Sequence, residues 1–438
     1  MRVAVLGIGY VGLVTGATAA LDGHRVICLD VADDKVEALR SGRAPFYEPG
    51  LEEAVRRMVS KKRLSASTDI EREVAASEMS FICVGTPSRR DGSADLRQVS
   101  EAARLIGTGL RDRKGYHVVV VKSTVPPDTT AGFVVPTVAR YSGAQPGDFG
   151  ACMCPEFLRE GDALQDSLKP DRIVIGELDR RSGDNLLAFY SRKRCPKLRM
   201  WLTAAELVKY ISNSFLATKI AFSNEMANLC EKFNVDVYEV MEGVGLDSRI
   251  GREFLRAGMG FGGSCFPKDL LALARVARKV GARSRIIEAV LRQNEEQPLR
   301  VVELAEEALG DLRGKAVAVL GLTFKPGTDD VRNSRAEPLI RALLARGARV
   351  IAHDPHGMEN FKKEFGLNIE YAETALDALK GRDAVVFQTE WPEYRRIPAS
   401  AYIRLMERPI VIDGRRTVEP RKLKLAGVRY FAIGAPRD

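Results

Sequence analysis

A glycine-rich stretch close to the N-terminus constrains the fold of this 438-residue chain more than any other feature. The sequence GIGYVG at residues 7–12 directly follows a short apolar segment at residues 2–6 and directly precedes an apolar helical pattern. A second apolar segment then ends in Asp30. Strand, glycines, helix, strand and acidic residue in this order are typical of a dinucleotide-binding βαβ unit. The N-terminal part of the chain therefore predicts a doubly wound parallel sheet.

The residues of this unit have separate expected roles. Gly7 makes the tight turn, Gly9 lets a pyrophosphate approach the backbone, and Gly12 allows close packing of helix and strand. The N-terminus of the helix then faces the phosphates. Asp30 would accept hydrogen bonds from the ribose hydroxyls, which favours NAD over NADP, and Lys35 could contact the adenosine half.

Polar residues follow two further predicted strands, at residues 80–84 and 117–122. Thr86 and Thr124 come after these strands, at the edge of a doubly wound sheet where cofactors bind. Threonine is also common in ordinary turns. We expect both residues to lie at the same edge as the glycine turn.

Two carboxylates follow in the next segment. Pro155 suits the first turn of a helix, and a helix starting there would place Glu156 and Glu160 one turn apart on one face. Such a pair is usually solvated. Its position after the cofactor edge is also compatible with a general base or a ligand-binding group.

A long apolar periodicity from Leu202 to about Phe233 predicts a helix. Lys209 and Asn213 are four residues apart on it and share one face. A lysine beside an apolar stripe is more often a surface residue than a buried one. We expect this helix to connect two domains and to pack against a second copy of the chain in a homodimer.

The strand pattern restarts near residue 313, and strands are predicted at 315–320, 349–354, 384–387 and 409–413. This second half lacks the GxGxxG pattern, so we expect it to hold a ligand other than the dinucleotide. Basic side chains that would meet an anionic ligand follow its strands, namely Lys325, Arg332, Arg415 and Arg416. The fold class is therefore α/β, with two Rossmann-like doubly wound parallel-sheet domains joined by a long central helix. We place the NAD-binding domain at 1–200, a central helical linker and dimerisation domain at 201–300, and the second Rossmann-like domain at 301–438.

One cysteine has an unusual setting. Cys265 follows a run rich in glycine and precedes Lys268 and Asp269. A nearby lysine favours the thiolate, the form that attacks carbonyls. If Pro267 opens a helix, Asp269 lies one turn from the thiol, where a base or an orienting carboxylate would stand. The alternative is a buried thiol beside a turn, because most free cysteines are small buried hydrophobes.

Composition narrows the class of protein. No apolar run approaches the roughly 20 residues that span a bilayer, and the first residues predict a strand instead of a signal peptide. The seven cysteines are scattered and odd in number, which fits neither a disulfide framework nor a zinc site. We expect a cytoplasmic protein without a metal or a membrane partner. The net charge of +9 comes without a dense basic tail, so we assign it to anionic ligands and the surface instead of nucleic acid.

Several longer stretches resemble the nucleotide-sugar dehydrogenases of the UDP-glucose/GDP-mannose dehydrogenase family, and the match covers nearly the whole chain. The stretch RIGREFLRAGMGFGGSCFPKD at 249–269 is highly specific, whereas the Rossmann glycines are not. The other matching stretches are GIGYVG (7–12), FYEPGL (46–51), STVPP (123–127), PEFLREG (155–161), AELVKYISNSFLATK (205–219), LTFKPGTDDVR (322–332) and TEW (389–391). One departure is Cys154, where the family usually has Asn.

The resemblance implies a role for each matching residue. Its catalytic residues would be Cys265 as nucleophile, Lys209, Asn213 and Asp269 for the oxyanion and the hydrolytic water, and Glu156 and Thr124 as assistants. Its NAD-binding residues would be Gly7, Gly9, Val11, Gly12, Asp30, Lys35, Thr86, Thr124, Glu160, Lys268 and Arg332. Its substrate-binding residues would be Glu156, Phe157, Leu158, Arg159, Glu160, Lys209, Asn213, Phe254, Leu255, Arg256, Ala257, Gly258, Gly262, Lys325 and Arg415, with Arg249 reaching a neighbouring subunit's substrate.

The resemblance also implies the reaction. The chain would oxidise UDP-glucose to UDP-glucuronate with NAD, a four-electron change that passes through a thiohemiacetal and a thioester on Cys265. GDP-mannose and UDP-N-acetylmannosamine are alternative substrates, and GTPSRRDG at 85–92 is similar to the GDP-mannose enzymes. A two-electron dehydrogenase of the hydroxyacid type would need no thiol. A non-catalytic NAD-binding regulator or a basic nucleic-acid-binding protein would leave Lys209 and Cys265 without a role.

Overall fold

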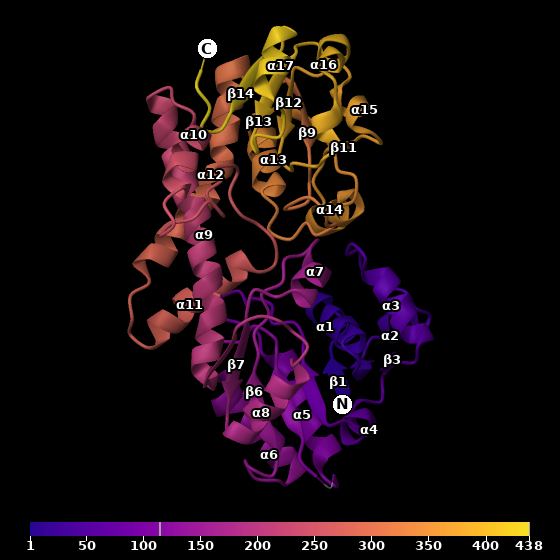
Figure 1. The fold of residues 1–438 in the computed structure, drawn as a ribbon. Helices are drawn as coiled ribbons and strands as arrows, with labels where there is room; N and C mark the ends of the chain where they lie inside the picture. The colour runs from indigo at the N-terminus through magenta and orange to yellow at the C-terminus, as the bar shows by residue number, and fades with distance from the viewer. Residues whose placement is uncertain (114, 438) are drawn as a thin grey trace. The chain divides into compact units, whose positions relative to one another are not determined.

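The computed structural model describes residues 1–113 and 115–437, and the chain separates into two compact α/β units. The first unit comprises Met1–Ser212 and Leu271–Gly281, and the second comprises Asn213–Leu270 and Ala282–Asp438. The long helix α9 (Leu202–Lys232) and the shorter α11 (Phe266–Lys279) each contain residues of both units (Figure 1). The expected long helix between the two halves of the chain is thus confirmed.

An eight-stranded sheet with the order β3-β2-β1-β4-β5-β6-β7-β8 forms the centre of the first unit. All neighbouring strands are parallel except β6 and β7. The strands are β1 (Arg2–Leu6), β2 (Arg25–Leu29), β3 (Leu64–Ser67), β4 (Met79–Ile82), β5 (Val118–Val121), β6 (Gly150–Met153), β7 (Ile173–Glu177) and β8 (Lys197–Trp201). The helices are α1 (Tyr10–Leu21), α2 (Asp33–Arg40), α3 (Leu51–Ser60), α4 (Ile70–Ala75), α5 (Arg97–Leu110), η1 (Thr130–Val134), α6 (Val135–Ser142), α7 (Ala163–Leu168) and α8 (Arg180–Phe189).

The second unit holds a six-stranded, fully parallel sheet with the order β11-β10-β9-β12-β13-β14. Its strands are β9 (Ala316–Leu320), β10 (Arg349–His353), β11 (Glu370–Tyr371), β12 (Ala384–Phe387), β13 (Ile410–Asp413) and β14 (Arg429–Ala432). Its helices are α10 (Val237–Gly245), α12 (Arg285–Leu309), α13 (Ala336–Ala345), α14 (Met358–Phe365), α15 (Ala375–Leu379), η2 (Tyr394–Arg396), α16 (Ala399–Leu405) and α17 (Pro420–Leu425).

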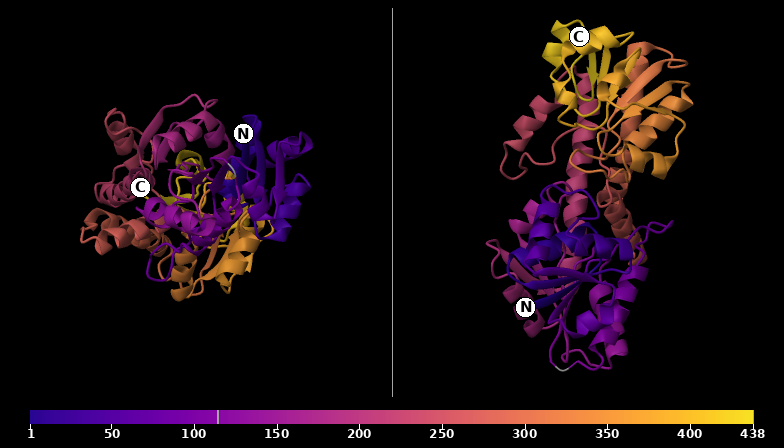
Figure 2. Two further views of the ribbon diagram at one scale, coloured as in Figure 1. Left: turned by 90° about the horizontal axis from the view of Figure 1, so that it is seen from below. Right: turned by 90° about the vertical axis from the view of Figure 1, so that its right-hand side faces the viewer.

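The inner strands of each sheet are buried on both faces because they are almost entirely apolar, as in β5 (VVVV) and β9 (AVAVL). In β1, Val3 and Val5 belong to one core cluster, while Ala4 and Leu6 belong to the cluster on the opposite face. The strand β9 of the second sheet alternates between two clusters in the same way. Helices therefore cover both faces of each sheet (Figure 2), and the predicted fold class is confirmed.

Two sequence-based expectations about helices are wrong. The segment after Pro155 is not helical, and the next helix, α7, begins only at Ala163. The sequence also predicts one continuous helix from about Leu270 through the 290s, but the chain forms two helices there, because it turns at Gly281 with a positive φ of 77°. Among the described residues, no helix combines the length and the apolar character needed to cross a membrane.

Candidate active site

The glycine turn of the first unit has the geometry of a phosphate-binding loop. Gly7 has a φ of +103°, and a Cβ there would lie 2.8 Å from the Cys83 carbonyl oxygen. A Cβ on Gly12 would lie 1.8 Å from the Gly7 carbonyl oxygen. A Cβ on Gly9, by contrast, would meet no atom within 4 Å. Gly9 is also the N-cap of α1 and offers no side-chain hydrogen bond, so the helix N-terminus faces open space that fits a pyrophosphate.

Asp30 lies at the end of β2, beside this turn. One carboxylate oxygen accepts the Ile8 N–H at 2.7 Å, and the other accepts the Ala32 N–H at 3.1 Å. Lys35 Nζ lies 3.9 Å from the carboxylate. A carboxylate has about four acceptor positions. Asp30 therefore keeps capacity for ribose hydroxyls, and the residues present fit NAD.

Asp354 of the second unit corresponds to Asp30 of the first, but other groups of the protein occupy its carboxylate. Asp354 follows β10 and is fully buried. Its carboxylate accepts hydrogen bonds from the backbone N–H groups of Leu322, Thr323, His356 and Gly357, and from the Thr323 hydroxyl and the Trp391 indole. No acceptor position is left for a ribose. This saturation supports the expectation that the second sheet does not bind a dinucleotide in the manner of the first.

Thr86 and Thr124 are adjacent, as their positions after β4 and β5 suggested. The Thr86 hydroxyl donates to the Thr124 carbonyl oxygen at 2.8 Å. The same loop is held further along by Glu206 of α9, a residue that the sequence analysis did not single out. Its buried carboxylate accepts the Asp128 N–H at 2.6 Å, the Thr130 N–H at 2.7 Å and the Thr130 hydroxyl at 2.6 Å.

The loop at residues 155–161 is irregular because side-chain carboxylates accept hydrogen bonds from backbone N–H groups in and just after it. Glu156 Oε2 accepts the Leu158 N–H at 2.5 Å. Glu48 Oε2 accepts the Gly161 N–H at 2.8 Å, and its Oε1 accepts the Ala163 N–H at 2.7 Å. These bonds replace a helical ladder and explain why the predicted helix does not form. Glu48 lies in the stretch FYEPGL, which is the only sequence signal for its role.

Lys209 and Glu156 form a buried ion pair in the first unit. The Lys209 ammonium lies 2.8 Å from Glu156 Oε1, and the two side chains are 3% and 7% exposed. Burial alone would raise the pKa of Glu156, but the Lys209 charge and the Leu158 hydrogen bond bring that pKa below its ordinary value. The lysine is therefore not the surface residue that helical statistics favour. The face of α9 that carries Lys209 also carries Asn213, one turn further on.

In the second unit, Asn213 and Asp269 lie beside Cys265. The Asn213 amide donates to Asp269 Oδ2 at 2.6 Å. Lys268 Nζ lies 2.5 Å from Asp269 Oδ1, so the lysine forms an ion pair with the carboxylate that follows it in the sequence. The Asp269 N–H donates to the Cys265 carbonyl oxygen at 2.9 Å, which confirms that a helical turn joins the two residues. The Cys265 thiol lies 3.6 Å from the Ser264 hydroxyl.

The burial of the cysteines distinguishes Cys265 from most others. Burial raises the pKa of Cys83 to about 12, and it raises the pKa values of Cys28 and Cys152 still further above the ordinary range. These thiols stay protonated and inert. Cys265 is only partly buried. Within the described part of the chain, no group of three His, Cys, Asp or Glu side chains converges to hold a metal.

The remaining predicted substrate residues lie in the second unit. The side chains of Leu255 and Ala257 pack into the core, so a ligand could reach only their backbone. Arg415 donates from Nε to the Gln388 carbonyl oxygen at 3.0 Å, and no carboxylate among the described residues forms an ion pair with it. Burial lowers its pKa, although Glu390 and Tyr238 act in the opposite direction. A half-buried guanidinium without a carboxylate in ion-pair contact is suited to an anionic ligand.

Arg249 and Arg332 are exposed and already bind carboxylates. Arg249 is 87% exposed and pairs with Asp247, while Arg332 pairs with Asp330 at 2.6 Å. Lys325 lies on the loop after β9, with its ammonium 5.8 Å from the Phe324 ring centre. The structure thus gathers the predicted residues in two sets, one in each unit, and the chain joins these sets through α9.

Comparison with known proteins assigns all three segments of the chain. The NAD-binding, central and UDP-binding domain models of one dehydrogenase family match residues 1–193, 203–296 and 318–420. The chain is 44% identical to the UDP-glucose 6-dehydrogenase AglM of Haloferax volcanii, over 96% of this chain and 98% of that protein. A solved UDP-glucose dehydrogenase from Pyrobaculum islandicum aligns with a TM-score of 0.92 and 48% identity, covering 99% and 98% of the two chains. A UDP-D-ManNAc dehydrogenase from Pyrococcus horikoshii aligns with a TM-score of 0.88 and 28% identity over 99% of both chains.

Proposed function

The chain belongs to the UDP-glucose/GDP-mannose dehydrogenase family, and from this premise we propose that it oxidises UDP-glucose to UDP-glucuronate with two molecules of NAD. The identity to the UDP-glucose dehydrogenase of Pyrobaculum islandicum exceeds that to the UDP-D-ManNAc enzyme of Pyrococcus horikoshii, 48% against 28%, which supports UDP-glucose as the substrate. The observation that carries the chemistry is the turn at Cys265. It holds a partly buried thiol one helical turn from Asp269, which in turn binds Asn213.

Cys265 would carry the sugar between the two oxidations. NAD, when bound, accepts one hydride from C6 of the sugar in each oxidation. The Cys265 sulfur would add to the aldehyde that the first oxidation leaves, and the aldehyde oxygen would take up the proton of the thiol. The second oxidation turns this thiohemiacetal into a thioester. Water then adds to the carbonyl carbon, the carbon–sulfur bond breaks, and the carboxylate and the free thiol form.

Five polar side chains would support these steps. Lys209 and Asn213 share a face of α9 and would donate to the negative oxygen, a contribution of roughly 3 kcal/mol per well-placed donor. Glu156 and Asp269 would orient and deprotonate the water, since each is a carboxylate with a fixed partner. Thr124 would assist from the loop after β5.

We assign NAD to the glycine turn of the first unit. Gly9 and the N-terminus of α1 would receive the pyrophosphate, and Asp30 the ribose, because these groups have open space and spare acceptor capacity. The other residues proposed for the coenzyme are Gly7, Val11, Gly12, Lys35, Thr86, Thr124, Glu160, Lys268 and Arg332.

We assign the sugar nucleotide to the loop at residues 254–262 with Lys325 and Arg415. The half-buried guanidinium of Arg415, which no described carboxylate contacts as an ion pair, supports an anion there. The residues proposed from the first unit and α9 are Glu156, Phe157, Leu158, Arg159, Glu160, Lys209 and Asn213. Arg249 would reach the substrate of a neighbouring subunit, which its 87% exposure permits.

A homodimer is the proposed assembly. Ile211, Phe215, Phe222 and Leu229 are 56%, 65%, 49% and 50% exposed, and their spacing places them on one face of α9. An apolar stripe of this kind is typical of an interface. A cytoplasmic location, and domain boundaries near residues 200 and 300, remain predictions of the cysteine pattern and of the strand pattern.

Counting NADH per molecule of sugar nucleotide tests this function. We expect two NADH for each UDP-glucose consumed, and slower turnover on GDP-mannose and UDP-N-acetylmannosamine. One NADH per substrate would replace the proposal with a two-electron dehydrogenase. Preference for another sugar nucleotide would keep the mechanism and change the substrate.

A further inference from the structure

The segment Gly258–Phe261 has neither helix nor strand, yet its backbone is hydrogen-bonded by buried side-chain amides. The Gly258 N–H donates to Asn224 Oδ1 at 2.8 Å, and Gln297 Nε2 donates to the Gly258 carbonyl oxygen at 3.0 Å. Asn224 and Gln297 are 0% and 1% exposed. Both bonding groups of this glycine are therefore satisfied from the helices α9 and α12.

Asn294 of α12 forms two hydrogen bonds with the backbone of Phe261, as a residue of a neighbouring β-strand would. Its Oδ1 accepts the Phe261 N–H at 2.7 Å, and its Nδ2 donates to the Phe261 carbonyl oxygen at 3.0 Å. The side chain is 2% exposed. A Cβ on Gly260 would lie 2.5 Å from Asn294 Oδ1, so a glycine at 260 lets the loop approach the amide this closely.

Helix α12 also lacks one of its internal hydrogen bonds at Asn294. Pro298 lies inside the helix and has no N–H to donate to the Asn294 carbonyl oxygen four residues earlier. Arg335 Nη1 lies 3.4 Å from that oxygen and donates to it instead. Arg335 also donates to the Asn333 carbonyl oxygen, and the Asn333 amide donates to the Gly263 carbonyl oxygen at 3.1 Å.

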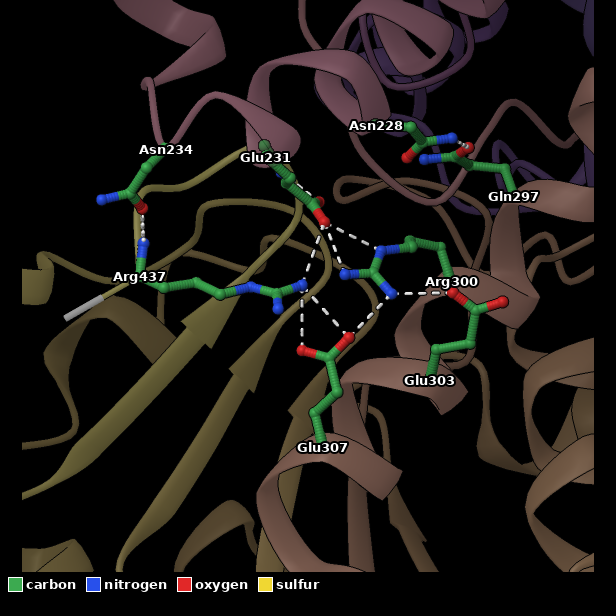
Figure 3. A network of polar contacts seen from close by, with 9 residues as sticks. Asn228, Glu231, Asn234, Gln297, Arg300, Glu303, Glu307 and Arg437 are labelled. Carbon is green, nitrogen blue, oxygen red and sulfur yellow. Dashed lines mark hydrogen bonds and ion pairs between the residues drawn. The ribbon is translucent and has the colours of Figure 1, made fainter.

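The three amides belong to a polar seam between α9 and α12. Asn228 of α9 donates to Gln297 Oε1 at 3.3 Å, and Figure 3 shows this pair beside the Glu231–Arg300 ion pair. The buried Glu231 carboxylate accepts two bonds from Arg300 and the Gly434 N–H, and Arg437 lies beside it. Two helices that had only to pack against each other would bury apolar side chains here. Asn224, Asn294 and Gln297, at the end of the seam near the loop, bond to backbone N–H and carbonyl groups of the loop. Those backbone groups need side-chain partners because the loop forms neither helix nor strand.

We propose that Asn224, Asn294 and Gln297 are positioning residues that hold the Gly258–Phe261 loop in the shape that receives the nucleotide sugar. A Cβ on Gly258 would lie 3.3 Å from Arg415 Nη1, so the loop passes beside the proposed anion-binding guanidinium. The loop also leads within a few residues to Cys265. The inference rests on the proposed function, because that function assigns the loop to the substrate.

Two conservative variants test the role. Asn294→Asp keeps the acceptor for the Phe261 N–H but turns the donor into a second acceptor facing the Phe261 carbonyl. Gln297→Met keeps the length of the side chain and removes the donor to Gly258. For each we expect the Kd for UDP and the KM for UDP-glucose to rise about tenfold, which corresponds to about 1.4 kcal/mol and to the loss of one buried hydrogen bond. The KM for NAD should not change, and hydrogen exchange at residues 258–261 should accelerate.

Arg300→Gln is the matched control. It breaks the Glu231 ion pair in the same seam without touching the loop, so it should lower the melting temperature and leave UDP affinity unchanged. Variants at 294 and 297 that fold with wild-type UDP affinity and unchanged exchange at residues 258–261 would overturn the inference. Equal loss of NAD and UDP binding would also overturn it. If the wild-type protein failed to bind UDP, the proposed function would fall, while the exchange measurement would still decide whether the amides order the loop.

Discussion

The ammonium of Lys209 lies 2.8 Å from the carboxylate of Glu156, and both side chains are almost completely buried. The pair ties helix α9 to the irregular loop at residues 155–161. Burial raises the pKa of Glu156, but the charge and hydrogen bond of Lys209, the Leu158 N–H and the Lys122 charge together lower it by more. The carboxylate is therefore ionised at neutral pH and can accept a proton.

Removing one partner of this pair should cost more than removing both charges. Lys209→Met leaves an unpaired buried carboxylate, and we expect it to reduce the free energy of unfolding by about 3–5 kcal/mol. The double variant Lys209→Met with Glu156→Gln should recover most of that stability but not the formation of acid. Urea unfolding and NADH production measure the two effects. A double variant as unstable as the single one would show that the ion pair is not the cause.

Cys265 should be required for the second oxidation. Cys265→Ala lacks the nucleophile, so we expect no acid from UDP-glucose. Cys265→Ser should stall after a covalent adduct, because an oxygen ester hydrolyses more slowly than a thioester, and the mass of the intact protein will reveal the adduct. Cys195 is also a partly buried free thiol, and Cys195→Ala should leave acid formation intact. Undiminished acid from Cys265→Ala would contradict the covalent mechanism.

Glu206 should make the stability of the fold depend on pH. Burial raises its pKa from an ordinary 4.5 to about 7, although the hydrogen bonds from Thr130 and Asp128 lower it and the Asp128 charge raises it further. The folded protein therefore binds this proton more tightly than the unfolded chain does. Its stabilising contribution is complete below about pH 4.5 and is lost as the pH rises through about 7.

The variant Glu206→Gln lacks this titration. The free energy of unfolding of the wild type, relative to that of the variant, should fall by roughly 3 kcal/mol between acid and mildly alkaline pH, since one pKa unit corresponds to about 1.4 kcal/mol. Urea unfolding across this range gives the difference. Two parallel pH curves would mean that the carboxylate does not titrate in this window.

The apolar stripe on α9 should mediate dimerisation. Phe215→Glu places a charge in the centre of the stripe, and we expect the variant to elute as a monomer whose mass light scattering confirms. Leu425 is 82% exposed on α17 and lies outside the stripe, so Leu425→Glu serves as the control and should not alter the mass. A wild-type monomer, or a Phe215→Glu dimer, would exclude this face as the interface.

Local patterns in the sequence were sufficient for the fold and for part of the site. The alternation of strand, glycine turn and helix, and the spacing from Cys265 to Asp269, each depend on neighbouring residues alone. Steric limits on the backbone and the helical repeat act over a few residues, and they leave a readable periodicity.

Tertiary structure decided how distant segments hold one another. Glu48 and Glu156 capture the backbone of residues 155–163 and prevent the helix that Pro155 suggested. The amides of Asn224, Asn294 and Gln297 serve a loop far from them in the chain. Hydrogen bonds between a side chain and a distant backbone segment leave no periodic pattern in the sequence. They depend on which segments the packed sheets and helices bring together. The sequence by itself therefore determined the helices and strands and singled out Cys265 as the proposed nucleophile, and only the folded chain determined which polar groups lie around them.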